Sequence, residues 1–311
     1  MRRAVRFMAA ALFLIGAAPF SESQANEYTI LTESRLVLLD VSVQKSGGGR
    51  VGGLEKDNFQ VFDNGKAMPI SVFANHDVPV TVGILVDESL SMRRKRADVI
   101  AAARAFIGAS NPKDEVFVVN FNENVKFGLP PDMPFSDNIK QLRTALDRGQ
   151  AQGRTALYDA VIAGLKHLEQ GRRDKKTLIV ISDGGDNASK ATRQQMLDEV
   201  SRNFATVYTI GIFDEDSSEK DPSILAKLAK MTGGISYFPA TLEGMLPVCW
   251  SIAADIRTRY TIGYGPPETE TGKRHKVRVV ASAPGMGSLK VRTRTGYWNE
   301  TARENPQGSQ G

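Results

Sequence analysis

Between residues 80 and 260, short runs of continuously apolar residues alternate with stretches in which apolar residues recur at helical spacing. A strand that is apolar at every position is buried on both faces, as in a parallel sheet covered by helices on both sides. We therefore predict an α/β fold with a doubly wound, mostly parallel sheet. The predicted strands are residues 80–86, 116–121, 125–127, 178–181 and 206–210, and the predicted helices are residues 97–107, 139–146, 157–168, 193–204 and 223–231, with a last helix that ends near Arg257.

Strand patterns of another kind flank this region, at residues 36–43, 59–62 and 70–73 before it and at 260–264, 276–280 and 289–295 after it. Within the first group, glycine-rich turns and an Asn64-Gly65 hairpin signal separate the strands from one another. Each group supplies only about three strands, too few for a stable unit, and the ends of a domain tend to lie close together. We predict that the two groups form one small β-rich domain.

Shifts in composition along the chain predict where it divides into segments. The predicted parts are a signal peptide (1–25), an N-terminal β-rich segment (26–78), the α/β domain (79–259), a C-terminal β-rich segment (260–299) and a polar, disordered tail (300–311).

The first 25 residues predict export. Three arginines in residues 1–6 precede an apolar run at 7–18, and Ser23-Gln24-Ala25 offers small residues where a signal peptidase cleaves. A membrane anchor needs about 20 apolar residues, and polar residues interrupt this run too early. We expect a periplasmic or secreted protein with no stable membrane anchor after cleavage. The single cysteine, Cys249, excludes an internal disulfide.

Charge and histidine content argue against two functional classes. The chain has 40 Lys and Arg against 35 Asp and Glu, with the two signs interspersed. A nucleic-acid-binding protein normally shows a larger basic excess gathered on one face, so we predict no nucleic-acid partner. None of the three histidines lies beside a nucleophile motif, and the sequence holds no Gly-x-Ser-x-Gly elbow. The sequence therefore gives no sign of a hydrolase that uses a serine or cysteine nucleophile.

Oxygen-bearing side chains follow the predicted strands where ligands bind to open parallel sheets, beyond the strands' carboxyl ends. Asp87, Ser89 and Ser91 come directly after the first strand of the α/β region. Asp183 follows the strand at 178–181, and Thr155 lies where a helix opens between the two strands. Two carboxylates and three hydroxyls are hard oxygen ligands, which suit Mg²⁺ or Mn²⁺ better than zinc or copper. The alternative is that the hydroxyls cap helices and Asp183 makes a turn.

These residues, in this order, resemble the metal-ion-dependent adhesion site of the von Willebrand factor type A domain family. The resemblance covers about residues 80–260, and its flanks are similar to those of exported bacterial proteins with such a domain between two β-rich pieces. It implies metal ligation by Asp87, Ser89, Ser91, Thr155 and Asp183. It also implies binding of a protein partner through the metal, without catalysis. Leu90 departs from the family, which often has Gly there.

The resulting hypothesis is a metal-dependent protein-binding module, for adhesion or assembly, of the bacterial envelope, whose partner offers an Asp or Glu to the metal. One alternative is a Mg²⁺-dependent phosphoryl-transfer hydrolase, which commonly has a second acid two residues after the first; here that position holds Ser89. Another is a structural assembly module whose metal only stabilises loops. The basic run from Arg93 to Arg96 attracts an acidic partner or is a solvated helical turn.

Overall fold

The computed structural model describes residues 36–213, 220–267 and 271–299. The predicted signal peptide and the predicted tail lie outside the described residues. Within the described ranges, every helix is too short or too polar to cross a membrane.

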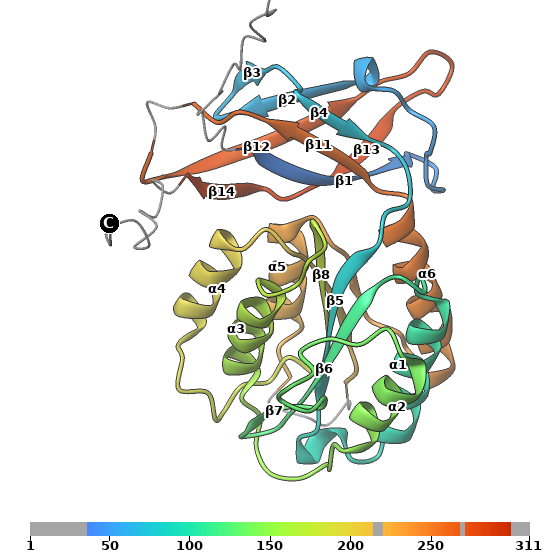
Figure 1. Cartoon of the computed structure of the whole chain (residues 1–311), viewed down its shortest axis with the longest axis vertical. Coiled ribbons are helices and arrows are strands. Elements are labelled where there is room, and N and C mark those ends of the chain that lie inside the picture. The colour runs from blue at the N-terminus through green and yellow to red at the C-terminus, as the bar shows by residue number, and fades with distance from the viewer. Residues whose placement is uncertain (1–35, 214–219, 268–270, 300–311) are drawn as a thin grey trace, which may run out of the picture. The chain divides into compact units, whose positions relative to one another are not determined.

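A six-stranded sheet forms the centre of the α/β unit (Figure 1). Its strands lie in the order β10-β9-β8-β5-β6-β7, and only β7 runs antiparallel to its neighbour. This order confirms the predicted α/β class with a mostly parallel sheet. The strands are β5 (Val80–Asp87), β6 (Glu115–Phe121), β7 (Val125–Phe127), β8 (Lys175–Ser182), β9 (Thr206–Gly211) and β10 (Ser236–Tyr237).

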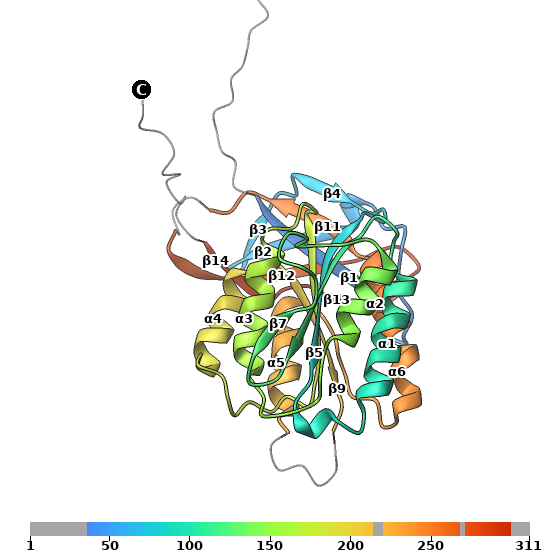
Figure 2. The same cartoon turned by 60° about the horizontal axis from the view of Figure 1, so that its bottom comes forward.

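Helices cover both faces of this sheet, as the apolar strand runs predict. Figure 2 shows α1, α2 and α6 on one side and α3, α4 and α5 on the other. Every residue of β5, β6 and β9 is buried, which accounts for the unbroken apolar runs in the sequence. The helices are α1 (Arg96–Ala109), α2 (Ile139–Asp147), α3 (Leu157–Leu168), α4 (Arg193–Arg202), α5 (Pro222–Thr232) and α6 (Met245–Arg257).

The flanking segments build two four-stranded sheets together, as predicted. One has the order β13-β1-β11-β4 and the other the order β14-β12-β2-β3, so each mixes strands from before and after the α/β unit. Their inner faces share one apolar core. The strands are β1 (Val37–Lys45), β2 (Phe59–Asp63), β3 (Lys66–Met68), β4 (Val72–Ala74), β11 (Tyr260–Tyr264), β12 (Lys273–Ala281), β13 (Leu289–Arg292) and β14 (Gly296–Asn299).

The strand predicted at 289–295 is shorter in the structure: only residues 289–292 form β13, and β14 begins beyond the predicted range, in the other sheet. β13 ends at Arg292, and the chain then crosses to pair as β14 with β12. At the crossing, the Thr295 amide donates to the Met231 carbonyl at 3.0 Å, and the Arg294 guanidinium donates to the carbonyls of Ser201 and Asn203. The apolar pattern of the sequence could not predict these contacts, because their partners belong to α5 and to α4 and its C-terminal end in the α/β unit.

A buried polar cluster joins the β-rich unit to the α/β unit. Asp255 on α6 is fully buried and accepts hydrogen bonds from Ser42 at 2.9 Å and from Tyr208 at 2.6 Å. Arg259, also buried, donates to Asp255 at 3.3 Å and to the Gly233 carbonyl. Burial opposes ionisation of Asp255, but the neighbouring Arg259 and Arg292 outweigh it and lower its pKa to about 2.

Deleting residues 260–311 is expected to expose the N-terminal strands. β1 lies between β11 and β13, and β2 lies between β12 and β3, so the deletion removes both neighbours of β1 and one of β2. Hydrogen exchange should then show loss of amide protection in residues 37–63, while residues 80–86 stay protected. Retained protection in residues 37–45 would mean that the N-terminal segment folds alone.

Candidate metal centre

The candidate centre lies where the two central strands of the sheet end. β5 and β8 are neighbours, with Val86 opposite Ile181, so Asp87 and Ser182 come to the same edge. Asp87 is 1% exposed and Asp183 is 3% exposed, so both carboxylates are withdrawn from water. Parallel pairing thus brings together two acids that are 96 residues apart in the sequence.

Four of the five predicted ligands are linked by hydrogen bonds, three of them through their side chains and Asp87 through the Ser89 backbone amide. Ser89 Oγ and Ser91 Oγ are 3.0 Å apart and hydrogen-bonded, and Ser91 Oγ donates to Asp183 Oδ2 at 2.8 Å. The backbone amide of Ser89 donates to Asp87 Oδ1 at 2.9 Å. Each of these oxygens keeps a further lone pair that could face a cation.

Thr155 reaches the same edge on the loop that precedes α3. The Leu90 amide donates to the Gly153 carbonyl at 3.1 Å, which ties this loop to the one after β5. Asn187 lies in the loop after β8. Its side-chain oxygen accepts from the Thr155 backbone amide at 2.9 Å, and its backbone amide donates to the Thr155 carbonyl. Thr155 is 5% exposed. Backbone bonds therefore hold all three loops against one another.

Helix capping does not account for these hydroxyls. The residue before α1 is Lys95 and the residue before α3 is Ala156, and neither makes a side-chain cap. In the first turn of α3, the Asp159 amide instead donates to the Ser189 hydroxyl at 3.1 Å. The capping alternative for Ser89, Ser91 and Thr155 is therefore not what the structure shows.

The electrostatics of the centre lack a positive partner. Burial raises the pKa of Asp87 to about 6; hydrogen bonds from Ser182 and Ser89 partly offset this, and the charge of Asp183 adds to it. Among the described residues, neither Asp87 nor Asp183 forms an ion pair with a Lys or Arg. A divalent cation would suit two adjacent buried carboxylates that form no ion pair. Its positive charge would stabilise their ionised form, which burial opposes.

The donor set also fits the chemistry of Mg²⁺ or Mn²⁺. It consists of carboxylate and hydroxyl oxygens, which are the ligands these hard cations prefer. Across the described chain, there is no cluster of three or more His, Cys, Asp and Glu side chains that could hold a metal. A metal at this edge would consequently depend on the hydroxyls as well as on the two acids.

Two residues of the candidate centre, Ser182 and Asn187, were not predicted from the sequence. Ser182 Oγ donates to Asp87 Oδ2 at 2.6 Å and accepts from the Gly184 amide, so it fixes the carboxylate's orientation. Its position at the end of the predicted strand, directly before Asp183, could have indicated that Ser182 lies at the candidate centre. Asn187 orients Thr155, but its signal is weak because polar residues are common in such loops.

The basic run beside the centre is only partly solvated. Arg96 binds Glu88 at 2.6 Å, and Lys95 is buried and donates to the Ile212 carbonyl at 3.4 Å. Arg93 and Arg94 are exposed. Leu90, where the chain departs from the family pattern, is 54% exposed. The face around the loop after β5 thus offers two arginines and one apolar side chain to solvent.

Comparisons with known proteins agree with this architecture. Residues 82–185, which include all five predicted ligands, match the family model of the von Willebrand factor type A domain. No curated protein matched the chain significantly.

Among solved structures, a von Willebrand factor type A protein from Catenulispora acidiphila is 16% identical, with a TM-score of 0.52 over 78% of this chain and 74% of that one. The von Willebrand factor domain of the type V pili tip protein Mfa5 from Porphyromonas gingivalis is a weaker likeness, 12% identical, with a TM-score of 0.46 over 58% of this chain and 97% of that one. The fold and the matched residues thus show that the α/β unit of this chain is similar to von Willebrand factor type A domains, with the family model matching over residues 82–185.

Proposed function

We propose that this protein is a metal-dependent protein-binding module of the bacterial envelope, exported to the periplasm or beyond. The observation that carries the proposal is the pair of buried carboxylates, Asp87 and Asp183, which lie in one hydrogen-bonded network with Ser89 and Ser91 and form no ion pair with a Lys or Arg among the described residues. Domains of this family are typically interaction modules and not enzymes, which supports a binding role.

Asp87, Ser89, Ser91, Thr155 and Asp183 would hold Mg²⁺ or Mn²⁺. The ion would supply positive charge at the sheet edge and a coordination position for an oxygen of the partner. Asp87 and Asp183 would contribute two negative charges, which balance those of the ion, and the neutral hydroxyls would add none, so the site would not repel an anionic oxygen of the partner. Ser91 is only half-buried, so the centre is open to a partner on that side. An Asp or Glu of the partner would complete the arrangement.

The phosphoryl-transfer alternative has no supporting observation. Ser89 stands two residues after Asp87, and its hydroxyl is hydrogen-bonded to Ser91. A serine is a poor general acid, because its proton leaves only at high pH. We expect no hydrolysis of p-nitrophenyl phosphate in Mg²⁺ above the rate of the Asp87→Ala variant.

Partner capture with and without metal tests the proposal. Mature protein immobilised on beads is incubated with envelope extract in Mg²⁺ or in EDTA, alongside Asp87→Ala and Asp132→Ala. Asp132 is an exposed acid outside the metal loops, so its variant is the matched control. We expect a defined protein to be retained in Mg²⁺ by wild type and Asp132→Ala alone. Equal retention in EDTA or by Asp87→Ala would refute a metal-dependent role.

A further inference from the structure

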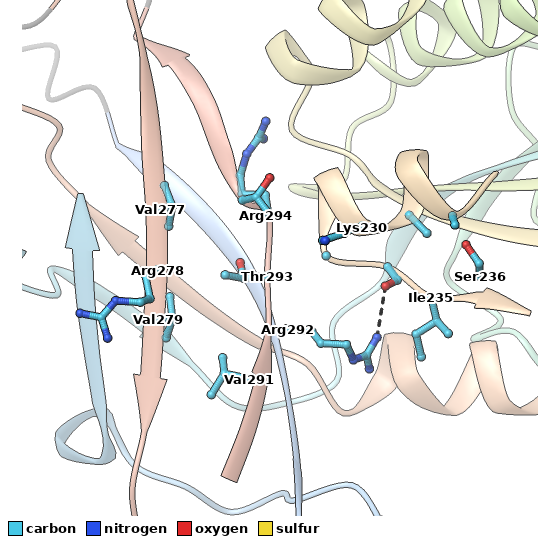
Figure 3. A pocket seen from close by; sticks show the side chains of 15 residues that line it. Lys230, Ile235, Ser236, Val277, Arg278, Val279, Val291, Arg292, Thr293 and Arg294 are labelled. Atoms are coloured by element: carbon cyan, nitrogen blue, oxygen red, sulfur yellow. Dashed lines mark hydrogen bonds between the residues drawn. The ribbon is translucent and has the colours of Figure 1, made fainter. Parts of the chain in front are cut away.

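A pocket of about 500 Å³ lies at the junction of the two units, on the side of α5. Figure 3 shows Val277 and Val279 of β12 on one side and Lys230 and Ile235 of the α/β unit on the other, with Thr293 between them. Ligand sites of this size are commonly found between domains, where two folded surfaces leave a concave space.

Most of the pocket wall is apolar. Val277, Val279 and Val291 come from the β-rich unit, and Ala226 and Ile235 come from the α/β unit. Burying an aliphatic chain against these side chains removes apolar surface from water, at roughly 25 cal/mol per Å². These apolar contacts would bind an aliphatic chain, but they would not discriminate between ligands with different polar head groups.

The polar groups of the pocket are mostly donors, and no acidic residue lines it. Lys230 is exposed and forms no ion pair with a described residue. The Thr293 hydroxyl oxygen is buried and has no hydrogen-bond partner in the described structure. Arg292 already binds Asp255 at 2.8 Å and adds only a long contact of 3.5 Å to the Gly234 carbonyl. An ammonium and an unused hydroxyl therefore remain for a ligand.

We propose that this pocket binds an aliphatic monocarboxylate, with its chain against the valines and its carboxylate at Lys230 and Thr293. A carboxylate accepts from both groups and carries the charge that Lys230 lacks. A cationic ligand would meet Lys230 and Arg292 with no compensating acid. A neutral alcohol would leave the ammonium unpaired. The site is separate from the candidate metal centre and does not depend on it.

Decanoate, below its micelle concentration, is the probe. Isothermal titration of the mature chain should show saturable decanoate binding, with decan-1-ol weaker and acetate undetectable. Lys230→Gln should weaken decanoate about tenfold, the effect of losing one charge-assisted hydrogen bond, and leave decan-1-ol unchanged. Lys227→Gln, an exposed lysine of α5 outside the pocket, is the matched control and should change neither.

A second variant tests the location. Ala226 is exposed on α5 and lines the pocket, so Ala226→Phe fills the space without entering the core. It should abolish decanoate binding while the thermal midpoint without ligand stays close to that of wild type. Absence of decanoate binding by wild type, decan-1-ol binding as tightly as decanoate, or decanoate affinity in Lys230→Gln equal to that in Lys227→Gln would each overturn the proposal.

Discussion

Replacing Asp255 by Ala is expected to lower the free energy of unfolding by about 3–5 kcal/mol, the usual effect of breaking a buried ion pair. Arg259 is 2% exposed and would keep only the Asp40 carboxylate, at 3.3 Å, as a charged partner. Tyr208 would lose the acceptor for its buried hydroxyl. Urea unfolding followed by circular dichroism measures the difference.

Asp77→Ala is the control for this variant. Asp77 pairs with Arg257 at 3.2 Å, but its side chain is 41% exposed, so its removal should cost at most about 1 kcal/mol. If both variants lose the same small amount, the cluster around Asp255 does not hold the two units together.

Acid provides an independent check of the same cluster. The pKa of Asp255 is lowered from its ordinary 3.8 to about 2 in the folded protein, mainly by Arg259 and Arg292 acting against burial. Its ionisation therefore stabilises the fold above about pH 4, and this contribution disappears as the pH falls toward 2. The stability gap between wild type and Asp255→Asn should narrow over that range. A gap that stays constant from pH 6 to pH 2 would contradict this assignment.

Asp87→Asn is expected to separate metal binding from folding. Its affinity for Mn²⁺ should fall by about 100-fold or more, because even residues behind the metal ligands commonly account for 10- to 100-fold. The amide oxygen can still accept from the Ser89 amide, and a buried charge beside Asp183 is removed. In EDTA at pH 7, the variant should therefore be at least as stable as wild type. A large loss of stability in EDTA would indicate a structural role for the carboxylate instead.

The α/β sheet could be predicted because its strands are apolar at every position. Burial on both faces leaves a strong pattern, and β5, β6 and β7 start and end within one residue of the predicted ranges. The carboxyl edge follows from the strand direction, so the sequence alone is enough to place Asp87 and Asp183 together.

Contacts between the units could not be predicted in the same way. Asp255 and Arg259 look like ordinary polar residues at the end of a helix. In the fold both are buried, and Asp255 is bonded to side chains of β1, β9 and β13. The crossing at residues 293–295 is a similar case, because it lies against Gly233 and its Thr295 amide donates to the Met231 carbonyl. Periodicity describes which face of an element is buried, and it contains no information on which distant polar groups meet.

Titration with Mn²⁺, followed by electron paramagnetic resonance, tests the central claim most directly. Free Mn²⁺ gives a strong signal that weakens when the ion is bound. The account predicts a single saturable site in the mature chain that Mg²⁺ empties by competition, that Asp87→Asn nearly abolishes and that Asp132→Asn leaves intact. Failure of wild type to bind Mn²⁺, or equal binding by wild type and Asp87→Asn, would contradict a metal centre at Asp87 and Asp183.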